Sequence, residues 1–239
     1  MKLIADLHTH TIASTHAYAT VTEMANEAAE LGLFALAITD HARTMPGAPG
    51  PFYFESLGLI PKYLKGVRLL KGIEANICDY EGNLDVEDSL QNNLDWVVAS
   101  MHTITIKGEA TVEKCTNAYI KLAENPNVNV IAHSGSEYFK YDYEKVIPVL
   151  AKNGKLIEIN DSAFRYNKDN KGNCVEIAKI CKKYNARICV DTDAHFTDTL
   201  GRAYKTLEML KDVDFPEKLI VNTSVENLKA YFDEKNISY

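Results

Sequence analysis

The sequence has no long apolar stretch and no sign of secretion. No run approaches the roughly 18 consecutive apolar residues of a membrane span, so we expect no transmembrane helix. The apolar run in the opening MKLIADLHTH is too short for a signal peptide. The five cysteines are scattered and form no C-x-x-C pair, which favours small buried side chains over disulfides or a cysteine-based metal site. We therefore expect a cytoplasmic protein.

Positive charge is also scarce. The chain carries 26 Lys and Arg against 33 Asp and Glu, a formal net charge of −7, and its basic residues form no cluster. Such a chain has no overall positive field and no basic track, which argues against nucleic acid as a partner. A small anionic ligand stays compatible with this charge, because metal ions or a few local cations can hold an anion.

Short apolar runs alternate with amphipathic helical patterns along the whole chain. Strand-like runs occupy residues 2–6, 34–41, 67–77, 95–102, 128–133, 155–160 and 187–195. Helical spacing marks residues 19–33, 111–123, 143–154, 173–185 and 199–213, and a last strand-like run at 218–223 precedes a helix at 224–232. This alternation predicts an α/β fold with a parallel sheet. Because no linker or repeat interrupts it, we expect residues 1–239 to form a single domain.

Every histidine lies at or just after the carboxyl end of a predicted strand. The seven are His8, His10, His16, His41, His102, His133 and His195. In a parallel barrel these strand ends open onto one face, where residues distant in sequence meet. An open doubly wound sheet would spread them along a line, so the histidine pattern favours a closed barrel.

The spacing of these residues indicates metal binding. Side chains two apart on a strand point the same way, so His8 and His10 can bind one ion together, and Asp193 and His195 repeat the spacing. Glu74 ends the third strand, where other strands carry histidine, and a carboxylate can bridge two ions. The candidate ligands are His8, His10, His16, His41, Glu74, His102, His133, Asp193 and His195. Imidazoles and carboxylates without cysteine suit Zn²⁺, Mn²⁺ or Fe²⁺, and this number of ligands suffices for about three divalent ions.

A structural role for these histidines is the competing interpretation. A single histidine at a strand end is more often a hydrogen-bonded or loop residue than a ligand. A purely structural role would have to hold independently at five strand ends, and it does not explain why no histidine lies elsewhere. We therefore predict a multi-metal site, with His16 the least supported member because it lies in a loop.

Six motifs in order resemble one known family. DLHTH, ITDH, GIEANI, MH, AHSG and DTDAH match the motifs of the PHP (polymerase and histidinol phosphatase) family across almost the whole chain. ASTHAY after the first motif, GIEANI, and VDFP near the end further resemble the trinuclear-zinc PHP phosphatases. That resemblance implies a distorted TIM-like (β/α)7 barrel and a cofactor of three divalent ions per chain, zinc foremost.

The resemblance also implies how the ligands are divided. One ion would take His8, His10, Glu74 and Asp193, a second Glu74, His102 and His133, and a third His16, His41 and His195. The chain departs from the family at two places. Ser134 stands where many relatives have proline, and Asp191-Thr192 stands where many have Gly-Ser. Because His133 is kept beside Ser134, we expect metal binding to survive that change with a slightly altered loop.

Three further carboxylates lie close to candidate ligands in the sequence. Asp6 and Asp40 each precede a histidine motif, and Asp191 lies two residues before Asp193. We expect all three in the shell around the ligands, where a carboxylate commonly accepts an imidazole N–H. A turn or cap role for Asp6 and Asp40, and a direct metal contact for Asp191, are the alternatives.

Clustered divalent ions with mixed ligands suit phosphate-ester hydrolysis. We predict a metal-dependent phosphatase that hydrolyses phosphate monoesters, in which a metal-bridging hydroxide attacks phosphorus in line and no protein base is assigned. Four cations follow strands on the same face and are candidates for holding the substrate phosphate: Arg43, Arg165, Lys168 and Arg202. Arg165 and Arg202 are the better candidates by position.

Three other functions stay open at this stage. A histidinol-phosphate phosphatase uses the same chemistry, and a phosphodiesterase or nuclease of the PHP type would need the basic track that this chain lacks. A metal-storage or sensing protein is the alternative that is not an enzyme, although storage would require closed coordination. A homo-oligomer also stays open, since Pro/Gly-rich and aromatic loops could line an interface.

Overall fold

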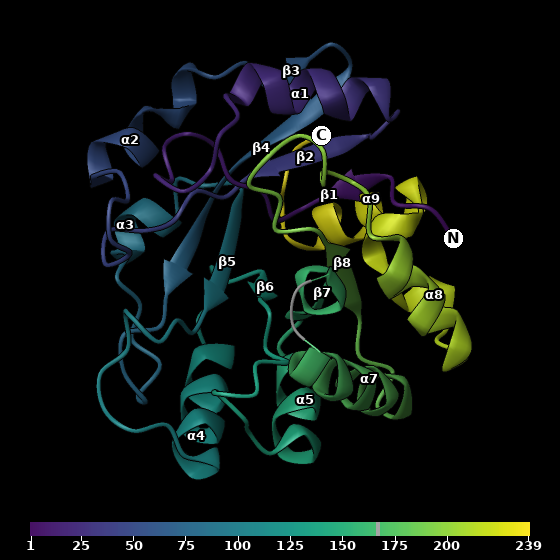
Figure 1. The fold of residues 1–239 in the computed structure, drawn as a ribbon. Helices are drawn as coiled ribbons and strands as arrows, with labels where there is room; N and C mark the ends of the chain where they lie inside the picture. Colours follow the sequence, from purple (N-terminus) through teal and green to yellow (C-terminus); the bar gives the residue numbers. More distant parts are fainter. Residues whose placement is uncertain (166–167) are drawn as a thin grey trace.

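The computed structural model describes the backbone of residues 1–165 and 168–239, and the side chains of residues 1–165 and 170–239 (Figure 1). Seven strands pair in parallel in chain order: β1 (Ala5–Asp6), β2 (Ala35–Ile38), β4 (Val67–Asn76), β5 (Trp96–Ser100), β6 (Val130–Ile131), β7 (Leu156–Asn160) and β8 (Ile188–Asp191). The short β3 (Tyr63–Leu64) pairs antiparallel with β4. The predicted α/β fold with a parallel sheet is confirmed.

The helices pack outside this sheet. They are α1 (Val21–Glu30), α2 (Pro51–Glu55), α3 (Asp88–Gln91), α4 (Val112–Ala123), α5 (Tyr143–Lys152), α6 (Ser162–Arg165), α7 (Lys168–Lys183), α8 (Tyr204–Asp212) and α9 (Val225–Glu234). Figure 1 shows α4, α5 and α7 side by side below the strands and α1 above them. Helix α1 begins with a capping box, in which Thr20 Oγ1 accepts from the Glu23 amide and the Glu23 carboxylate accepts from the Thr20 amide. Among the described residues, every helix is too short or too polar to span a bilayer.

The first and last strands meet along a seam that nearly closes the barrel. Thr9 and Ala194 form a parallel bridge just beyond the strand ends, and the His10 amide donates to the Ala194 carbonyl at 2.9 Å. Lower in the seam, hydrogen bonds from the side chain of Asn222 replace direct backbone hydrogen bonds between β1 and β8. Its amide nitrogen donates to the carbonyls of Ala5 (3.0 Å) and Val190 (2.7 Å). The predicted distorted TIM-like barrel is confirmed, and side chains inserted between β1 and β8 account for part of its distortion.

The barrel interior is apolar at one end and polar at the other. Alternate strand residues, among them Leu70, Leu156 and Cys189, join one buried cluster with residues of α9. Trp96 fills this end, with its ring centroid 5.9 Å from that of Tyr231 on α9. Four residues after Leu70, and two after Leu156 and Cys189, the same alternation brings Glu74, Glu158 and Asp191 inward at the carboxyl end. The strand period thus separates a packed base from a buried polar top.

Two predicted elements differ from the structure. The strand-like run at 218–223 forms two short 3₁₀ helices, Glu217–Leu219 and Val221–Thr223, because Asn222 bonds the seam with its side chain instead of continuing a strand. The helix predicted over 199–213 begins only at Tyr204, although Leu200 before it is buried.

Gly72 on β4 lies where the backbone of β5 comes too close for a side chain. A Cβ atom at this position would lie 2.8 Å from the Trp96 carbonyl oxygen.

Candidate metal centre

One carboxylate stands at the centre of the polar end of the barrel. Glu74 is fully buried, and its backbone bonds the segment after β2, donating to the Asp40 carbonyl at 3.0 Å and accepting from the Ala42 amide at 2.9 Å. Five imidazole nitrogens approach its oxygens: His41 Nδ1 at 2.5 Å, His133 Nε2 at 3.0 Å, and the Nε2 atoms of His8, His10 and His102 at 3.5 Å. A rigid strand therefore holds this carboxylate among side chains from four other strand ends.

Asp193 provides a second carboxylate close to His8 and His10. Its Oδ1 lies 3.1 Å from His10 Nε2 and 3.6 Å from His8 Nε2. One ligand atom from each of these three residues lies within 4.8 Å of the others, a spacing at which one ion can contact all three. Asp193 has a φ of 54° and His133 a φ of 28°, both in the left-handed region that most side chains avoid. Backbone strain of this kind gathers at functional sites.

The remaining histidines form a third group at the rim. His41 Nε2 lies 3.2 Å from His16 Nε2, while the ring of His195 stacks on that of His16 with 4.6 Å between centroids. His41 thus faces Glu74 through Nδ1 and His16 through Nε2. The structure brings together all nine side chains that the sequence singled out, including His16 from its loop.

The donor atoms suit a divalent cation. His8 Nε2 and His195 Nε2 are buried and make no hydrogen bond to any residue that the structure describes. A buried polar atom without a partner is costly, and several here point into one space lined by further nitrogen and carboxylate donors. Nitrogen and oxygen donors without sulfur are ligands of zinc and similar ions. The residues present therefore fit bound divalent metal.

Burial and the charges of neighbouring side chains shift the pKa values of the candidate ligands. Burial disfavours ionised Glu74, but the surrounding imidazoles, with His41 foremost, hold the pKa of its carboxyl well below the ordinary value. Burial lowers the pKa of His10 to about 3, and the charge of His41 adds to the effect. For His8, burial is outweighed by carboxylates led by Glu158, which raise its pKa well above the ordinary value. An ionised Glu74 and a neutral His10 are the forms that bind metal.

Glu158 on β7 is a residue that the sequence interpretation missed. Its Oε1 lies 2.7 Å from His8 Nδ1, and its Oε2 accepts from the backbone amide of His133 at 2.6 Å. Oε2 also accepts from Asn160 Nδ2 at 2.9 Å. The sequence feature that could have revealed it is a glutamate between two isoleucines in the strand-like run KLIEIN. Such a carboxylate sets the tautomer and the orientation of an imidazole ligand.

Two other partners of the histidines were also missed. Asn76 Oδ1 lies 2.9 Å from His102 Nδ1, and Ser14 Oγ lies 3.3 Å from His10 Nδ1. Ser14 also accepts from the His41 amide at 3.1 Å. Both residues lie within four positions of a candidate ligand, but asparagine and serine in such places are too common to attract notice.

The three carboxylates expected to accept imidazole N–H groups bond elsewhere among the described residues. Asp6 accepts from the Thr192 amide at 3.1 Å and from the Gly201 amide at 2.8 Å, and Asp191 accepts from the Leu7 amide at 2.7 Å. The bonds from the Thr192 and Leu7 amides join the ends of β1 and β8, where the seam lacks a regular ladder. Burial raises the pKa of Asp6 to about 6, and burial together with the charge of Glu158 raises that of Asp191 well above its ordinary value.

Asp40 acts on the loop after β1. It accepts from the Thr11 amide, from Ser14 Oγ and from Tyr53 Oη, each at 2.7 Å. Its link to an imidazole therefore runs through the Ser14 hydroxyl that contacts His10. The proximity expected from the sequence is present, but the partner is a loop that shapes the site.

Two hollows open onto the histidines. The first, called here the Arg165 hollow, has a volume of about 370 Å³ and is lined by His16, Tyr18, Arg165, Asp193, His195, Phe196, Asp198 and Thr199. The second, the Met45 hollow, has a volume of about 340 Å³ and is lined by His16, His41, Met45, Pro46, His102, Ile104, Asp193 and His195. Both volumes fall in the range of small-ligand sites, about 300–1,000 Å³.

The basic side chains predicted to bind the substrate phosphate lie in different parts of the structure. Arg165 lines the first hollow, where its Nη2 donates to the Thr192 carbonyl and its Nε lies 3.2 Å from Asp161. Arg202 instead pairs with Glu27 on α1 at 2.5 Å. The side chain of Lys168 lies outside the described residues.

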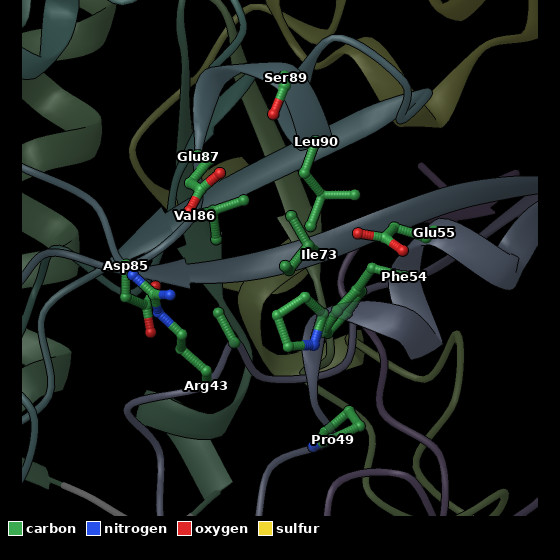
Figure 2. A pocket seen from close by; sticks show the side chains of 12 residues that line it. Arg43, Pro49, Phe54, Glu55, Ile73, Asp85, Val86, Glu87, Ser89 and Leu90 are labelled. Atoms are coloured by element: carbon green, nitrogen blue, oxygen red, sulfur yellow. The ribbon is translucent and has the colours of Figure 1, made fainter.

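Arg43 borders a different cavity, of about 180 Å³, on the other side of β4 (Figure 2). Figure 2 shows its guanidinium beside Asp85, with Ile73 and Phe54 on the apolar walls. Ile73 precedes Glu74 and points the opposite way along the strand. Strand β4 therefore separates Arg43 from the histidines.

Comparisons with known proteins identify relatives of this chain. A model of the PHP domain family matches residues 6–162. A protein of Acetivibrio thermocellus named "Probable phosphatase" is 46% identical, covering 98% of this chain and 97% of its own length. A protein of Thermoanaerobacter sp. with the same description is 42% identical over 98% of this chain and 96% of its own length.

A solved structure is similar in fold. Histidinol phosphate phosphatase of Lactococcus lactis, in complex with zinc, L-histidinol and phosphate, aligns with a TM-score of 0.61 and 17% identity, covering 89% of this chain and 94% of its own. The chain is an enzyme, a hydrolase of the phosphatase class. The resemblance seen in six ordered sequence motifs is confirmed: this chain belongs to the PHP family.

Proposed function

We propose that the chain is a phosphomonoesterase that holds three divalent ions, with zinc the best suited to its ligands. The position of Glu74 carries the proposal, since five imidazoles converge on one buried carboxylate. The proposed sets are His8, His10, Glu74 and Asp193 for one ion, Glu74, His102 and His133 for the second, and His16, His41 and His195 for the third. We also propose that residues 1–239 act as one domain, because the seam joins β1 to β8 and α9 packs beneath the barrel.

The chain itself contributes position and charge to the reaction. When bound, divalent ions lower the pKa of coordinated water and neutralise phosphate oxygens. Glu74 presents one oxygen to His8, His102 and His133 and the other to His10 and His41, which suits a carboxylate shared between ions. Arg165 lines the hollow beside His16, Asp193 and His195, where its charge can hold a phosphate oxygen. No side chain is required as a separate general base.

Assays of metal-replete enzyme test the activity. We expect hydrolysis of p-nitrophenyl phosphate and little hydrolysis of bis-p-nitrophenyl phosphate, a diester. The substrate panel includes histidinol phosphate, because the fold is similar to that of a histidinol phosphate phosphatase. Preferential cleavage of the diester would favour the phosphodiesterase alternative, and inactivity on every ester by metal-loaded protein would favour metal storage.

Elemental analysis tests the metal site apart from activity. Protein purified without added metal, then reconstituted and desalted, should retain close to three divalent ions per chain. Retention near zero after reconstitution would overturn the site. Retention of one or two tightly bound ions would contradict the three-ion proposal while leaving a hydrolase possible.

A further inference from the structure

The hydroxyl of Ser14 lies between two candidate metal ligands and one carboxylate. Ser14 Oγ donates to Asp40 Oδ1 at 2.7 Å and accepts from the His41 amide at 3.1 Å. His10 Nδ1 lies 3.3 Å from the same oxygen. All four residues are buried. Because a hydroxyl has one proton and two lone pairs, these three partners use its full capacity.

The short bond to Asp40 takes the proton of the Ser14 hydroxyl. An ionised carboxylate only accepts, and a charge-assisted O–H···O bond of 2.7 Å is stronger than a neutral contact of 3.3 Å. Only lone pairs remain for the other two partners, so His10 Nδ1 fits this place as an N–H donor. A neutral imidazole has one N–H, and the lone pair of His10 Nε2 therefore stays free. That atom lies 3.1 Å from Asp193 Oδ1, in the group of donors assigned to one ion.

Asp40 is held in turn by Tyr53 on α2. The Tyr53 hydroxyl donates to Asp40 Oδ2 at 2.7 Å, and the Thr11 hydroxyl donates to the same oxygen at 2.8 Å. Burial, together with the charge of Asp40, raises the pKa of Tyr53 above its ordinary value, so the hydroxyl keeps the proton that it donates. Phe54 beside it is buried, and the two rings pack edge to face with 5.1 Å between centroids. Helix α2 and the loop after β1 thus fix the carboxylate from two sides.

We propose that Tyr53 is a positioning residue of the metal centre, which acts through Asp40 and Ser14 to hold His10 as the Nδ1–H tautomer with Nε2 available to metal. This inference rests on the proposed metal-binding function. Without the Tyr53 hydroxyl, Asp40 Oδ2 keeps only its bond from Thr11, and the carboxylate is freer to turn. The Ser14 proton can then turn toward His10 Nδ1. That arrangement favours the other tautomer, whose Nε2 carries a proton and cannot bind metal.

Chelator competition on Tyr53→Phe, Ser14→Ala and the double variant tests this network. Loss of a group that orients a ligand commonly weakens metal affinity about 10- to 100-fold, so we expect zinc affinity to fall about tenfold in Ser14→Ala and about three- to tenfold in Tyr53→Phe. The double variant should bind zinc no more weakly than Ser14→Ala, because Tyr53 acts through Ser14. Losses that multiply in the double variant would overturn the network.

Nuclear magnetic resonance of zinc-loaded protein labelled with ¹⁵N-histidine reads the state of His10 directly. His10 should give an Nδ1–H signal, assigned by its absence in His10→Gln. Its proton should exchange with water about tenfold faster in Tyr53→Phe and in Ser14→Ala than in wild type, as expected for the weakening of one hydrogen bond. A merely structural role of Tyr53 would leave this proton unchanged.

The control is a tyrosine–aspartate bond near the C-terminus. Tyr239 Oη donates to the Asp233 carboxylate at 3.0 Å, and Tyr239→Phe should change neither zinc affinity nor the exchange of the His10 proton. Wild-type zinc affinity in Tyr53→Phe, or a His10 ring without an Nδ1–H, would overturn the positioning role and leave the proposed phosphatase intact. Wild-type protein that retains no zinc after reconstitution would overturn both.

Discussion

Glu158 Oε1 lies 2.7 Å from His8 Nδ1, while the other oxygen of the same carboxylate accepts from the His133 amide at 2.6 Å. One buried side chain therefore positions residues that we assign to two different ions. It also supports the left-handed backbone at His133, where φ is 28°. Each oxygen of Glu158 accepts a hydrogen bond, so the carboxylate has no chemically equivalent replacement.

Replacing Glu158 with glutamine should weaken metal binding more than folding. The amide NH₂ group of glutamine cannot accept a bond, so either the His8 contact or the His133 contact is lost. Loss of such a partner commonly weakens metal affinity about 10- to 100-fold. Chelator competition measures the affinity, and circular dichroism checks the fold. Glu144→Gln is the matched control, because Glu144 pairs with Lys183 on the surface. Equal affinity in Glu158→Gln and wild type would refute the positioning role.

Glu74→Gln should remove activity and loosen two ions. The neutral amide lacks the charge that two ions would share, and one of its ends cannot ligate metal. The retained metal should fall from about three ions to about one, the ion assigned to His16, His41 and His195. Glu55→Gln on the surface is a control for loss of a glutamate charge. Full activity of Glu74→Gln would rule out a bridging role.

Asn222→Ala should destabilise the barrel at its seam. The carbonyls of Ala5 and Val190 would lose the Asn222 amide, and the Val190 amide would lose its acceptor at 3.0 Å. Buried groups left without partners cost about 1–3 kcal/mol each, so the loss of three partners should lower the free energy of unfolding by about 3 kcal/mol or more. Urea denaturation measures it. Asn227→Ala, at a half-buried asparagine whose side chain donates one long bond of 3.5 Å to the Lys218 carbonyl, should change it by less than about 1 kcal/mol.

Lys155 should make stability rise with pH in mildly alkaline solution. Burial lowers the pKa of this lysine to about 8, and the charge of Lys235 adds to the effect. The unfolded chain has a lysine pKa near 10.4, so between about pH 8 and pH 10 it binds more protons than the folded chain. The free energy of unfolding should therefore increase as the pH rises through this window, by at most about 1.4 kcal/mol per pH unit.

Comparison with Lys155→Met isolates that contribution. Groups that do not interact with Lys155 and titrate in the same window affect both proteins alike, so the difference in the free energy of unfolding between them reports on Lys155 and on its repulsion with Lys235. Lys155 also donates to the Val128 carbonyl at 2.8 Å, and loss of that bond offsets the whole curve rather than changing its slope. Parallel curves between pH 8 and pH 9.5 would show that the lysine has an ordinary pKa in the folded chain.

The sequence alone determined the fold class and the nine candidate ligands. Alternating strand and helix patterns are local properties, and the end of an apolar strand is visible in the sequence around His102 or His133. Parallel strands place all such ends on one face, so the meeting of these side chains followed from topology alone. No precise geometry was needed for that step.

Only the tertiary structure decided which side chain supports which. Asp6 and Asp191 close the seam because β1 and β8 meet without a full ladder, and no local pattern records that meeting. Glu158 faces His8 because both point into the barrel from strands 150 residues apart. Arg165 and Arg202 look equivalent in the sequence, yet one lines a hollow and the other pairs with Glu27. Hydrogen-bond partners depend on distances of a few ångströms between segments remote in the chain, whereas strand ends depend only on the chain's local pattern.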